Sequence, residues 1–170
     1  VANCFSELQD KGELPLRVTH NDTKLNNIMI DNKTGKGICV IDLDTVMPGL
    51  AMNDFGDSIR FGASTAAEDE KDLSKVSCSM DLYERYVRGF IEGCAGRLTE
   101  QEIDLLPMGA KVMTFECGMR FLTDYLQGDR YFKIHREGHN LDRCRTQFKL
   151  VADMEQKWDT MQEIVEKYKK

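Results

Sequence analysis

Apolar and polar positions near the start of the chain form short runs that are separated by turn residues. This pattern predicts three short strands, at residues 14–20, 26–31 and 37–42. The segment between the last two strands, DNKTGKG, is rich in residues that tolerate turns, so these strands are expected to form a β-hairpin. Residues 1–13 are predicted to contain only a short helix.

The strand pattern ends at residue 42, and the next segment shows neither a strand period nor a helical one. We expect residues 43–62 to form a loop, because four residues that favour turns punctuate it: Pro48, Gly49, Gly56 and Gly62. After it, residues 67–72 (AEDEKD) are predicted to form an acidic connection on the surface.

A helical period dominates the rest of the chain. A helix is predicted within residues 79–96, with Ser79 or Asp81 as its N-cap. It is indicated by apolar residues at helical spacing: Leu82, Tyr86, Phe90 and Ile91.

Three more helices are predicted further along. Thr99 and Glu102 form a capping-box pattern at the start of one helix, and Pro107 is expected to kink or restart it. The other two are predicted over residues 110–126 and about 141–168. The helix over 110–126 carries an apolar stripe that we expect to lie in the core: Val112, Phe115, Met119 and Leu122.

Together these elements predict a mainly helical α+β fold, in which a hairpin with a polar loop packs on a bundle of about four helices. A length of 170 residues is typical of one domain, spanning 1–170. The pattern divides this domain into a lead-in helix, a loop-and-hairpin region and a helical region, at residues 1–13, 14–62 and 63–170.

The composition limits the classes of partner that the chain is expected to bind. A net charge of −6 without a basic cluster argues against a nucleic-acid partner. No apolar run approaches the roughly 18–20 residues of a membrane span and no signal-peptide pattern is present, so we expect no membrane partner and a cytoplasmic location. Six cysteines without paired spacing predict reduced thiols rather than disulfides or a zinc site: Cys4, Cys39, Cys78, Cys94, Cys117 and Cys144.

Polar side chains gather in residues 20–27 (HNDTKLNN), which we call the polar loop. Asp22 follows the first predicted strand, Asn27 stands at the entry of the hairpin, and Asp42 stands at its exit. Because a hairpin returns the chain to the place that it left, these three residues should converge. Carboxylate and amide oxygens suit Mg²⁺, which usually shares its coordination sphere with phosphates.

This grouping has the pattern of a kinase catalytic site, in which H-x-D-x-x-x-x-N precedes a hairpin and a metal-binding aspartate. Asp22 would accept the proton of an attacking hydroxyl, while Asn27 and Asp42 hold the metal on ATP. The alternative is an Asx-rich turn with surface aspartates, since these residues are common in turns. The placement of all three residues at strand ends favours the catalytic site.

Four segments of the chain resemble the kinase-like phosphotransferases that include aminoglycoside phosphotransferases, choline kinases and N-acetylhexosamine 1-kinases. They are HNDTKLNNIMID, VIDLDTVMPG, NDFGDSIR and RFLTDYLQGDRYF. The last of these, together with the DTKxxN form of the loop, resembles the N-acetylhexosamine 1-kinase branch most closely. The resemblance implies the C-terminal lobe of a protein-kinase-like fold and transfer of the γ-phosphate of ATP to a sugar hydroxyl, with Mg²⁺ as cofactor.

The resemblance also implies roles for individual residues. Asp22 matches the catalytic base, and Asn27 and Asp42 match the magnesium ligands. Arg120 and Tyr131 match positions that face the sugar in the sugar kinase branch. Asp44, two residues after Asp42, would face the same pocket and either bind the substrate or support the metal. Three more match supporting positions, of which Asp57 would brace the loop: His20, Lys24 and Asp57. For Lys24 an exposed turn position is as compatible with the pattern as a role in offsetting phosphate charge.

The family places a small N-terminal lobe, with the adenine pocket and an ATP-contacting lysine, before this region. Residues 1–13 hold only a short predicted helix, so the chain is expected to be the C-terminal lobe alone, with little or no turnover. The expected partners are a small-molecule acceptor, namely a sugar, and the missing lobe, supplied in the same polypeptide or by a partner chain.

Two other functions compete with this one. The run VIDLDTV resembles haloacid-dehalogenase-type phosphatases, in which Asp42 would be the nucleophile and Asp44 the acid. That fold needs a parallel α/β sheet, whereas here a hairpin precedes the motif and helices follow it. The second competitor is a non-catalytic helical interaction domain that keeps a relict kinase loop.

Overall fold

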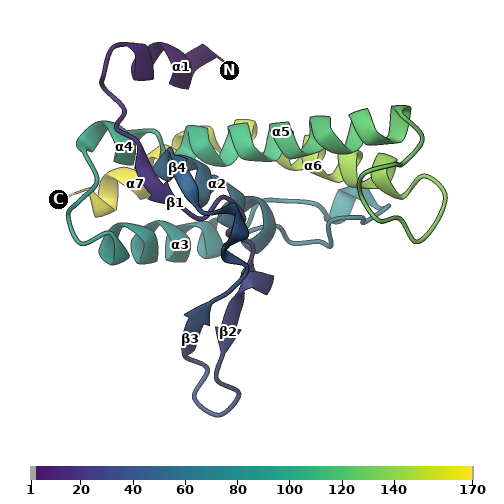
Figure 1. Cartoon of the computed structure of the whole chain (residues 1–170), viewed down its shortest axis with the longest axis horizontal. Helices are drawn as coiled ribbons and strands as arrows, with labels where there is room; N and C mark the ends of the chain where they lie inside the picture. Colours follow the sequence, from purple (N-terminus) through teal and green to yellow (C-terminus); the bar gives the residue numbers. More distant parts are fainter. Residues whose placement is uncertain (1–2, 170) are drawn as a thin grey trace.

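The structure, a computed structural model, describes residues 3–169 and is a mainly helical α+β fold (Figure 1). In chain order its elements are α1 (Asn3–Asp10), β1 (Arg17–Thr19), β2 (Ile28–Ile30), β3 (Gly37–Val40), β4 (Met47–Gly49), α2 (Ala51–Gly62), α3 (Met80–Gly93), α4 (Glu100–Asp104), α5 (Leu106–Leu126), α6 (His139–Gln156) and α7 (Trp158–Tyr168). Single turns of 3-10 helix lie at Leu25–Asn27, Leu43–Thr45 and Leu73–Lys75.

Two antiparallel two-stranded sheets flank the polar loop. The predicted hairpin is confirmed: Ile28 of β2 pairs with Val40 of β3, and the register shifts between Met29 and Ile30. β1 pairs with β4, a strand in the segment that was predicted to be a loop. Figure 1 shows the β2–β3 hairpin projecting away from the helical body.

The prediction of a loop over residues 43–62 is wrong for its second half, where α2 spans Ala51–Gly62. Met52, Phe55 and Ile59 lie on one face of this helix and are fully buried. Gly56 and Gly62, which were taken as turn signals, lie in this helix and allow close packing instead.

α2 crosses α5 at close range, and glycines permit the approach. A Cβ atom on Gly56 would overlap the carbonyl group of Gly109, and a Cβ atom on Gly109 would overlap the carbonyl oxygen of Met52. Overlap with backbone atoms cannot be relieved by rotating a side chain, so neither glycine tolerates a larger residue without moving a helix. Gly62 is similarly close to the ring of Tyr86 on α3.

The core lies between α2, α3, α5, α6 and α7. Phe55 is central to it, since its ring meets Tyr83 edge-on with centroids 5.9 Å apart and lies 5.3 Å from Phe90. The largest fully buried hydrophobic side chains come from all five helices: Met52, Phe55, Ile59, Tyr83, Leu106, Leu150, Met154 and Met161.

The core position predicted for the apolar stripe of the helix over 110–126 is confirmed for Val112, which packs against the core, but is wrong for Phe115 and Met119. Phe115 and Met119 are 44% and 42% exposed, whereas Gly118 and Phe121 are buried. α5 carries apolar residues around most of its circumference, so the helical period does not show which side faces the bundle. The face that packs on α6 is the one that carries Gly118, where the lack of a side chain lets the ring of Phe148 approach closely.

The single helix predicted over 141–168 is instead two helices, α6 and α7, which meet at Lys157. The ammonium group of Lys157 donates to Ser77 Oγ at 2.6 Å, to the Cys78 carbonyl at 2.9 Å and to the Asp153 carboxylate at 2.7 Å. These contacts tie the junction to the segment before α3. They join residues far apart in the sequence, which a helical period does not reveal.

Predictions that rest on local capping are confirmed. Ser79 caps α3 by accepting a backbone N–H, and Thr99 and Glu102 form the capping box of α4. α5 restarts next to Pro107. Glu102 also accepts both ends of the Arg17 guanidinium, at 2.9 and 2.6 Å, and thereby links the first strand to α4.

Within residues 3–169, no helix is long and apolar enough to cross a membrane. The thiols expected to be reduced are free at Cys39, Cys78, Cys94, Cys117 and Cys144, while the side chain of Cys4 lies outside the described part. Burial raises the pKa of Cys78 to about 12 and that of Cys117 to about 11, so neither thiol is reactive at neutral pH.

Gly109→Ala is expected to lower the free energy of unfolding by about 1–3 kcal/mol, because the added methyl group overlaps backbone atoms of α2. Gly89→Ala is the matched control: Gly89 lies in α3 with open space at its Cβ position, so alanine should stabilise the helix by about 0.5–1 kcal/mol. Chemical denaturation followed by circular dichroism measures both. A Gly109→Ala protein as stable as the wild type would contradict the close crossing.

Candidate active site

The polar loop leaves β1 and enters the hairpin through a turn of 3-10 helix. Its chain reverses at Asn21, whose φ of 63° lies in the left-handed region that asparagine tolerates. Asn27 is 5% exposed, and its Nδ2 donates to the backbone carbonyl and to the carboxylate Oδ2 of Asp22, each at 2.8 Å. Two of the three residues that were expected to converge are therefore in direct contact.

Lys24 adds a positive charge to this pair, with its Nζ 2.8 Å from Oδ2 of Asp22. Partial burial by itself would raise the pKa of Asp22. Hydrogen bonds from Lys24 and Asn27, together with the charge of Lys24, outweigh this effect and hold the pKa of Asp22 below its ordinary value. Asp22 is therefore ionised at neutral pH and ready to accept a hydrogen bond.

The ring of His20 joins the polar loop to the end of the hairpin. Its Nδ1 accepts the backbone N–H of Asp22 at 3.3 Å, so the proton is on Nε2, which donates to the carbonyl of Ile41 at 3.0 Å. Both ring nitrogens are thus engaged with the backbone. His20 occupies a supporting position rather than one suited to proton transfer.

A carboxylate of α2 that the sequence motifs did not single out holds the polar loop in place. Asp54 accepts the backbone N–H groups of His20 and Asn21, each at 2.8 Å. Burial raises the pKa of Asp54, and these two donors offset part of the effect. The bracing role expected of Asp57 therefore falls to Asp54, three residues earlier. Choosing between the two aspartates requires knowing that α2 is a helix and which side faces the loop.

Asp42 and Asp44 follow β3, and both are exposed. Asp42 has a left-handed backbone, with φ 65° and ψ 56°. The preceding residue, Ile41, donates its N–H to the carbonyl of Asn27 at 2.9 Å, so the main chain brings Asp42 beside Asn27. Because Nδ2 of Asn27 faces Asp22, its Oδ1 is the atom that remains for a cation.

The donor set beside the hairpin suits a magnesium ion better than a metal that needs a full protein cage. Among the described residues, no three His, Cys, Asp or Glu side chains gather closely enough to form such a cage. Mg²⁺ keeps several waters and takes phosphate oxygens as ligands, so one carboxylate and one amide oxygen are sufficient protein ligands. Asp42 and Asn27 each carry one such group at the base of the hairpin.

A cavity of about 590 Å³ opens beside Asp22 and is bounded by the polar loop, α2, α5, α6 and the connection between the last two helices. Five of the predicted site residues line it: Asp22, Lys24, Asp57, Arg120 and Tyr131. The other four lie outside its lining: His20, Asn27, Asp42 and Asp44. The predicted residues thus form two groups, one in the cavity and one near the base of the hairpin. Asp22 connects them, since it contacts Lys24 of the first group and Asn27 of the second.

One side of the cavity is formed by Arg120, Tyr131 and Phe132, which we call the aromatic wall. The guanidinium carbon of Arg120 lies 5.9 Å from the ring centroid of Tyr131 and 5.4 Å from that of Phe132. Phe132 also packs on Phe121, with centroids 4.7 Å apart. The wall therefore offers flat apolar faces and N–H donors side by side.

Two carboxylates pair with the buried Arg60 in the same cavity, and one of them is buried while the other is partly exposed. Its Nε donates to Asp57 at 2.9 Å and its Nη1 donates to Glu68 at 2.7 Å. Asp57 is 7% exposed, and its Oδ2 has no hydrogen-bond partner among the described residues. The acidic connection over 67–72, expected to lie on the surface, thus directs Glu68 into the protein.

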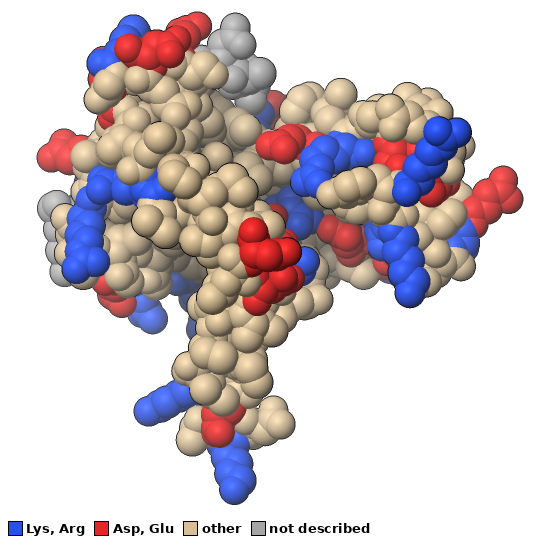
Figure 2. All heavy atoms as spheres, in the orientation of Figure 1, with Lys and Arg blue, Asp and Glu red and all other residues tan. Residues whose placement is uncertain are grey.

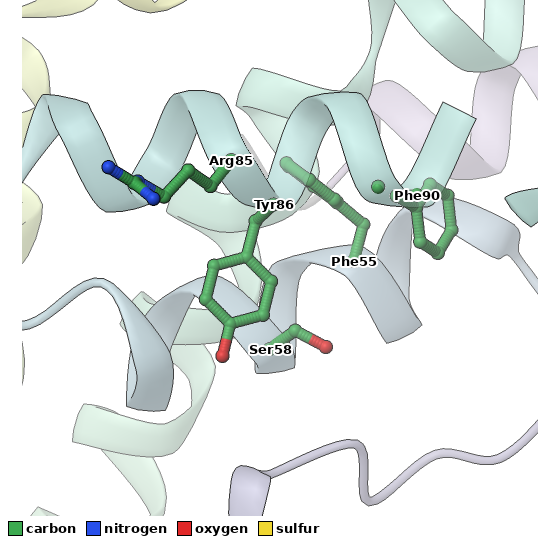
Figure 3. A pocket seen from close by; sticks show the side chains of 6 residues that line it. Phe55, Ser58, Arg85, Tyr86 and Phe90 are labelled. Atoms are coloured by element: carbon green, nitrogen blue, oxygen red, sulfur yellow. The ribbon is translucent and has the colours of Figure 1, made fainter. Parts of the chain in front are cut away.

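A second hollow, of about 270 Å³, lies between α2 and α3 (Figure 3). Figure 3 shows Phe55 and Ser58 on one helix facing residues of the other. Its lining consists of Phe55, Ser58, Arg85, Tyr86, Gly89 and Phe90. This lining contains no carboxylate, histidine or cysteine, and its side-chain oxygens are the hydroxyl groups of Ser58 and Tyr86, so it lacks the anionic base that Asp22 supplies to the larger cavity.

Lys24→Met is expected to raise the pKa of Asp22, because it removes a hydrogen bond and a positive charge that oppose the effect of burial. An NMR titration of the Asp22 carboxyl group measures the change, and the acidic limb of any pH–rate profile should move to higher pH with it. Lys33→Met, at the exposed hairpin turn, is the control and should leave this pKa unchanged. An unchanged value in Lys24→Met would contradict the ion pair.

Asp54→Ala is expected to lower the free energy of unfolding by about 1–3 kcal/mol, because two backbone N–H groups of the polar loop lose their acceptor. Asp54→Asn keeps one acceptor oxygen and should lose less. Denaturation curves of the two variants test this order. Equal stability of Asp54→Ala and the wild type would show that the loop is held by other contacts.

Comparison with known proteins adds one finding. A family profile described as the phosphotransferase enzyme family (APH) matches residues 1–86. The matched region contains the polar loop, the hairpin, α2 and the start of α3, while the aromatic wall lies beyond it.

Proposed function

We propose that this chain, which belongs to the phosphotransferase enzyme family, is the protein-kinase-like C-terminal lobe of an ATP-dependent sugar kinase. Membership of the family implies a kinase-type activity. The acceptor that we propose is an N-acetylhexosamine, phosphorylated on its anomeric hydroxyl. The observation that carries the proposal is an ionised aspartate, held by an asparagine and a lysine, at the edge of a cavity of about 590 Å³.

Asp22 is the catalytic base in this proposal. Although burial acts against it, the contacts with Lys24 and Asn27 keep Asp22 ionised, so it can accept a hydrogen bond and then the proton of the acceptor hydroxyl. Phosphoryl transfer needs little covalent chemistry from the protein, so orienting the attacking oxygen is the larger contribution. Lys24 places a positive charge beside the same carboxylate, near the charge that develops during transfer.

Mg²⁺ and ATP are the cofactor and co-substrate, as is general for kinases of this family. Oδ1 of Asn27 and the carboxylate of Asp42 are the oxygen donors that would hold the metal. When bound, Mg²⁺ neutralises charge on the phosphates. His20 and Ile41 keep the two ligands in place through the backbone bonds that join the polar loop to the hairpin.

The aromatic wall and Asp44 are proposed to bind the acceptor. Tyr131 and Phe132 offer faces on which the C–H side of a sugar ring can stack, and Arg120 offers donors to hydroxyl and acetamido oxygens. Acidic and basic side chains both line the cavity, among them Glu116 and Arg120, so its charge is mixed and suits a neutral polar acceptor such as a sugar.

The apolar surface of the hairpin region supports a further part of the proposal. A large group of exposed apolar side chains lies in residues 16–47: Leu16, Val18, Leu25, Ile28, Met29, Ile30, Ile38, Val40, Ile41, Leu43, Val46 and Met47. Figure 2 shows the hairpin largely in tan, with charged atoms near its tip. A group of exposed apolar side chains this large is typical of an interaction site. We propose that an N-terminal lobe, in the same polypeptide or on a partner chain, covers it and completes the ATP site.

A haloacid-dehalogenase-type phosphatase and a non-catalytic interaction domain are the two alternatives to a kinase. In the described part of the chain both sheets are antiparallel, which does not match the parallel sheet that a haloacid-dehalogenase-type phosphatase requires around Asp42 and Asp44. A non-catalytic helical domain with a relict loop would keep the same fold but would not need Asp22. The loss of the Asp22 carboxylate therefore separates this alternative from a kinase.

ADP release is the direct assay, with Mg-ATP and a panel of N-acetylhexosamines, hexoses, choline and an aminoglycoside. It is run on the 170-residue chain and on a form extended upstream. We expect N-acetylhexosamine-dependent turnover in the extended form, and a loss on the order of a hundredfold or more in Asp22→Asn. Asp81→Asn, an exposed carboxylate on α3, is the matched control and should retain full turnover.

Each outcome has a definite meaning. Turnover that depends on a sugar and disappears only in Asp22→Asn supports the kinase and identifies its acceptor. Turnover with choline or the aminoglycoside, and not with the sugars, would support the kinase activity but contradict the proposal that the acceptor is a sugar. No turnover in either form, from folded protein, favours the relict interaction domain.

A further inference from the structure

The loop that joins α5 to α6, residues 127–138, carries Tyr131 and Phe132 of the aromatic wall but has no regular secondary structure. A hollow of about 490 Å³ lies outside the wall, and Arg120, Tyr131 and Phe132 line both this hollow and the larger cavity. Phe132 packs on Phe121, but Tyr131 is mostly exposed, so packing contributes little to the position of the Tyr131 ring. A set of hydrogen bonds also holds the α5–α6 loop.

Asp124, in the last turn of α5, accepts these hydrogen bonds. Its Oδ1 accepts the backbone N–H groups of Arg130 and Tyr131, both at 2.8 Å, and its Oδ2 accepts that of Phe132 at 2.9 Å. Asp124 is 4% exposed. Burial by itself would raise the pKa of Asp124, but the three backbone donors outweigh it and hold the pKa below its ordinary value.

Asn140 completes the arrangement from α6. Its side chain is fully buried, and Nδ2 donates to Asp124 at 2.9 Å and to Asp129 at 2.8 Å. The chain reverses at Gly128 and Asp129, whose φ angles of 87° and 56° are left-handed. All four groups that contact the Asp124 carboxylate are N–H donors. An asparagine of the same shape would direct its own N–H₂ group at some of them, so the position requires a carboxylate.

The backbone bonds determine where the two rings lie. Tyr131 is 75% exposed, so burial contributes little to its placement. Its ring centroid lies 4.8 Å from that of Phe132, and the guanidinium of Arg120 lies over both. The rings take their position from the main chain that carries them, and Asp124 fixes that main chain.

We propose that Asp124 is a positioning residue for the acceptor, which presents the aromatic wall to a sugar ring without touching the sugar itself. The proposal rests on the proposed kinase function. It assigns acceptor affinity to a buried carboxylate that borders the hollow outside the wall but does not line the cavity beside Asp22, whereas the polar loop is anchored independently by Asp54. Loss of the Asp124 charge should therefore weaken acceptor binding and leave the Asp22 pair intact.

A purely structural role for Asp124 is the competing explanation, and Asp153 provides the matched control. Asp153 is also a mostly buried carboxylate that accepts a backbone N–H, from Cys78 at 2.7 Å, and it pairs with Lys157. It does not line the cavity. Asp124→Asn and Asp153→Asn should both lower the melting temperature, but only the former should change the affinity for the acceptor.

The experiment titrates N-acetylglucosamine and N-acetylgalactosamine into the 170-residue chain and its variants, followed by ligand-observed NMR. We expect Asp124→Asn to bind the preferred sugar roughly tenfold to a hundredfold more weakly than the wild type, since a displaced wall loses its contacts. Asp153→Asn should bind as the wild type does. Hydrogen exchange should show protected amides at Arg130, Tyr131 and Phe132 in the wild type and lose this protection in Asp124→Asn.

The outcomes separate this inference from the function on which it rests. Wild-type affinity in Asp124→Asn, or equal weakening in Asp153→Asn, would overturn the positioning role alone. If the wild type binds neither sugar, the sugar acceptor and the positioning role both fail. If Asp124→Asn does not fold, the sugar affinity of Gly128→Ala is the test. An alanine at this left-handed position strains the same turn, and its methyl group overlaps no other atom. Weaker binding then supports the proposal, and unchanged binding overturns it.

Discussion

The close crossing of α2 and α5 is the constraint on which the rest of the site depends. Gly56 and Gly109 allow the two backbones to approach with no side chain between them. α2 carries Asp54, which holds the polar loop, and α5 carries Arg120 of the aromatic wall. The two glycines contribute no functional group themselves, but they set how closely the helices that carry Asp54 and Arg120 approach each other.

Both irregular segments around the cavity are held in the same way. A helical aspartate accepts two or three consecutive backbone N–H groups of a loop: Asp54 those of the polar loop, and Asp124 those of the α5–α6 loop. A loop bound through its main chain keeps its side chains available for other partners. This division leaves Asp22 and Tyr131 free to face the cavity while their backbones stay fixed.

The sequence predicted those parts of the molecule that depend on neighbouring residues. The hairpin, the Thr99–Glu102 capping box and the contact between Asp22 and Asn27 all rest on short-range patterns, and the structure contains them. The missed features depend on distant partners. α2 was hidden by packing glycines, the α5 face was decided by α6, and the junction at Lys157 is held by residues before α3. Asp54 could not be chosen over Asp57 without the helix that orients both.

Hydrogen bonds join the hairpin to the polar loop. Val40 and Ile41 are exposed on the apolar hairpin surface, yet Ile41 receives the His20 ring and donates to the carbonyl of Asn27. The hairpin is therefore joined to the polar loop twice, by the main chain that runs from Asn27 into β2 and by the hydrogen bonds of Ile41, and neither connection passes through the helical core. Because Ile28 of β2 follows Asn27 directly and Ile41 directly precedes Asp42, both residues at the base of the hairpin are continuous with its strands, and any body that binds the hairpin also holds these two residues in place.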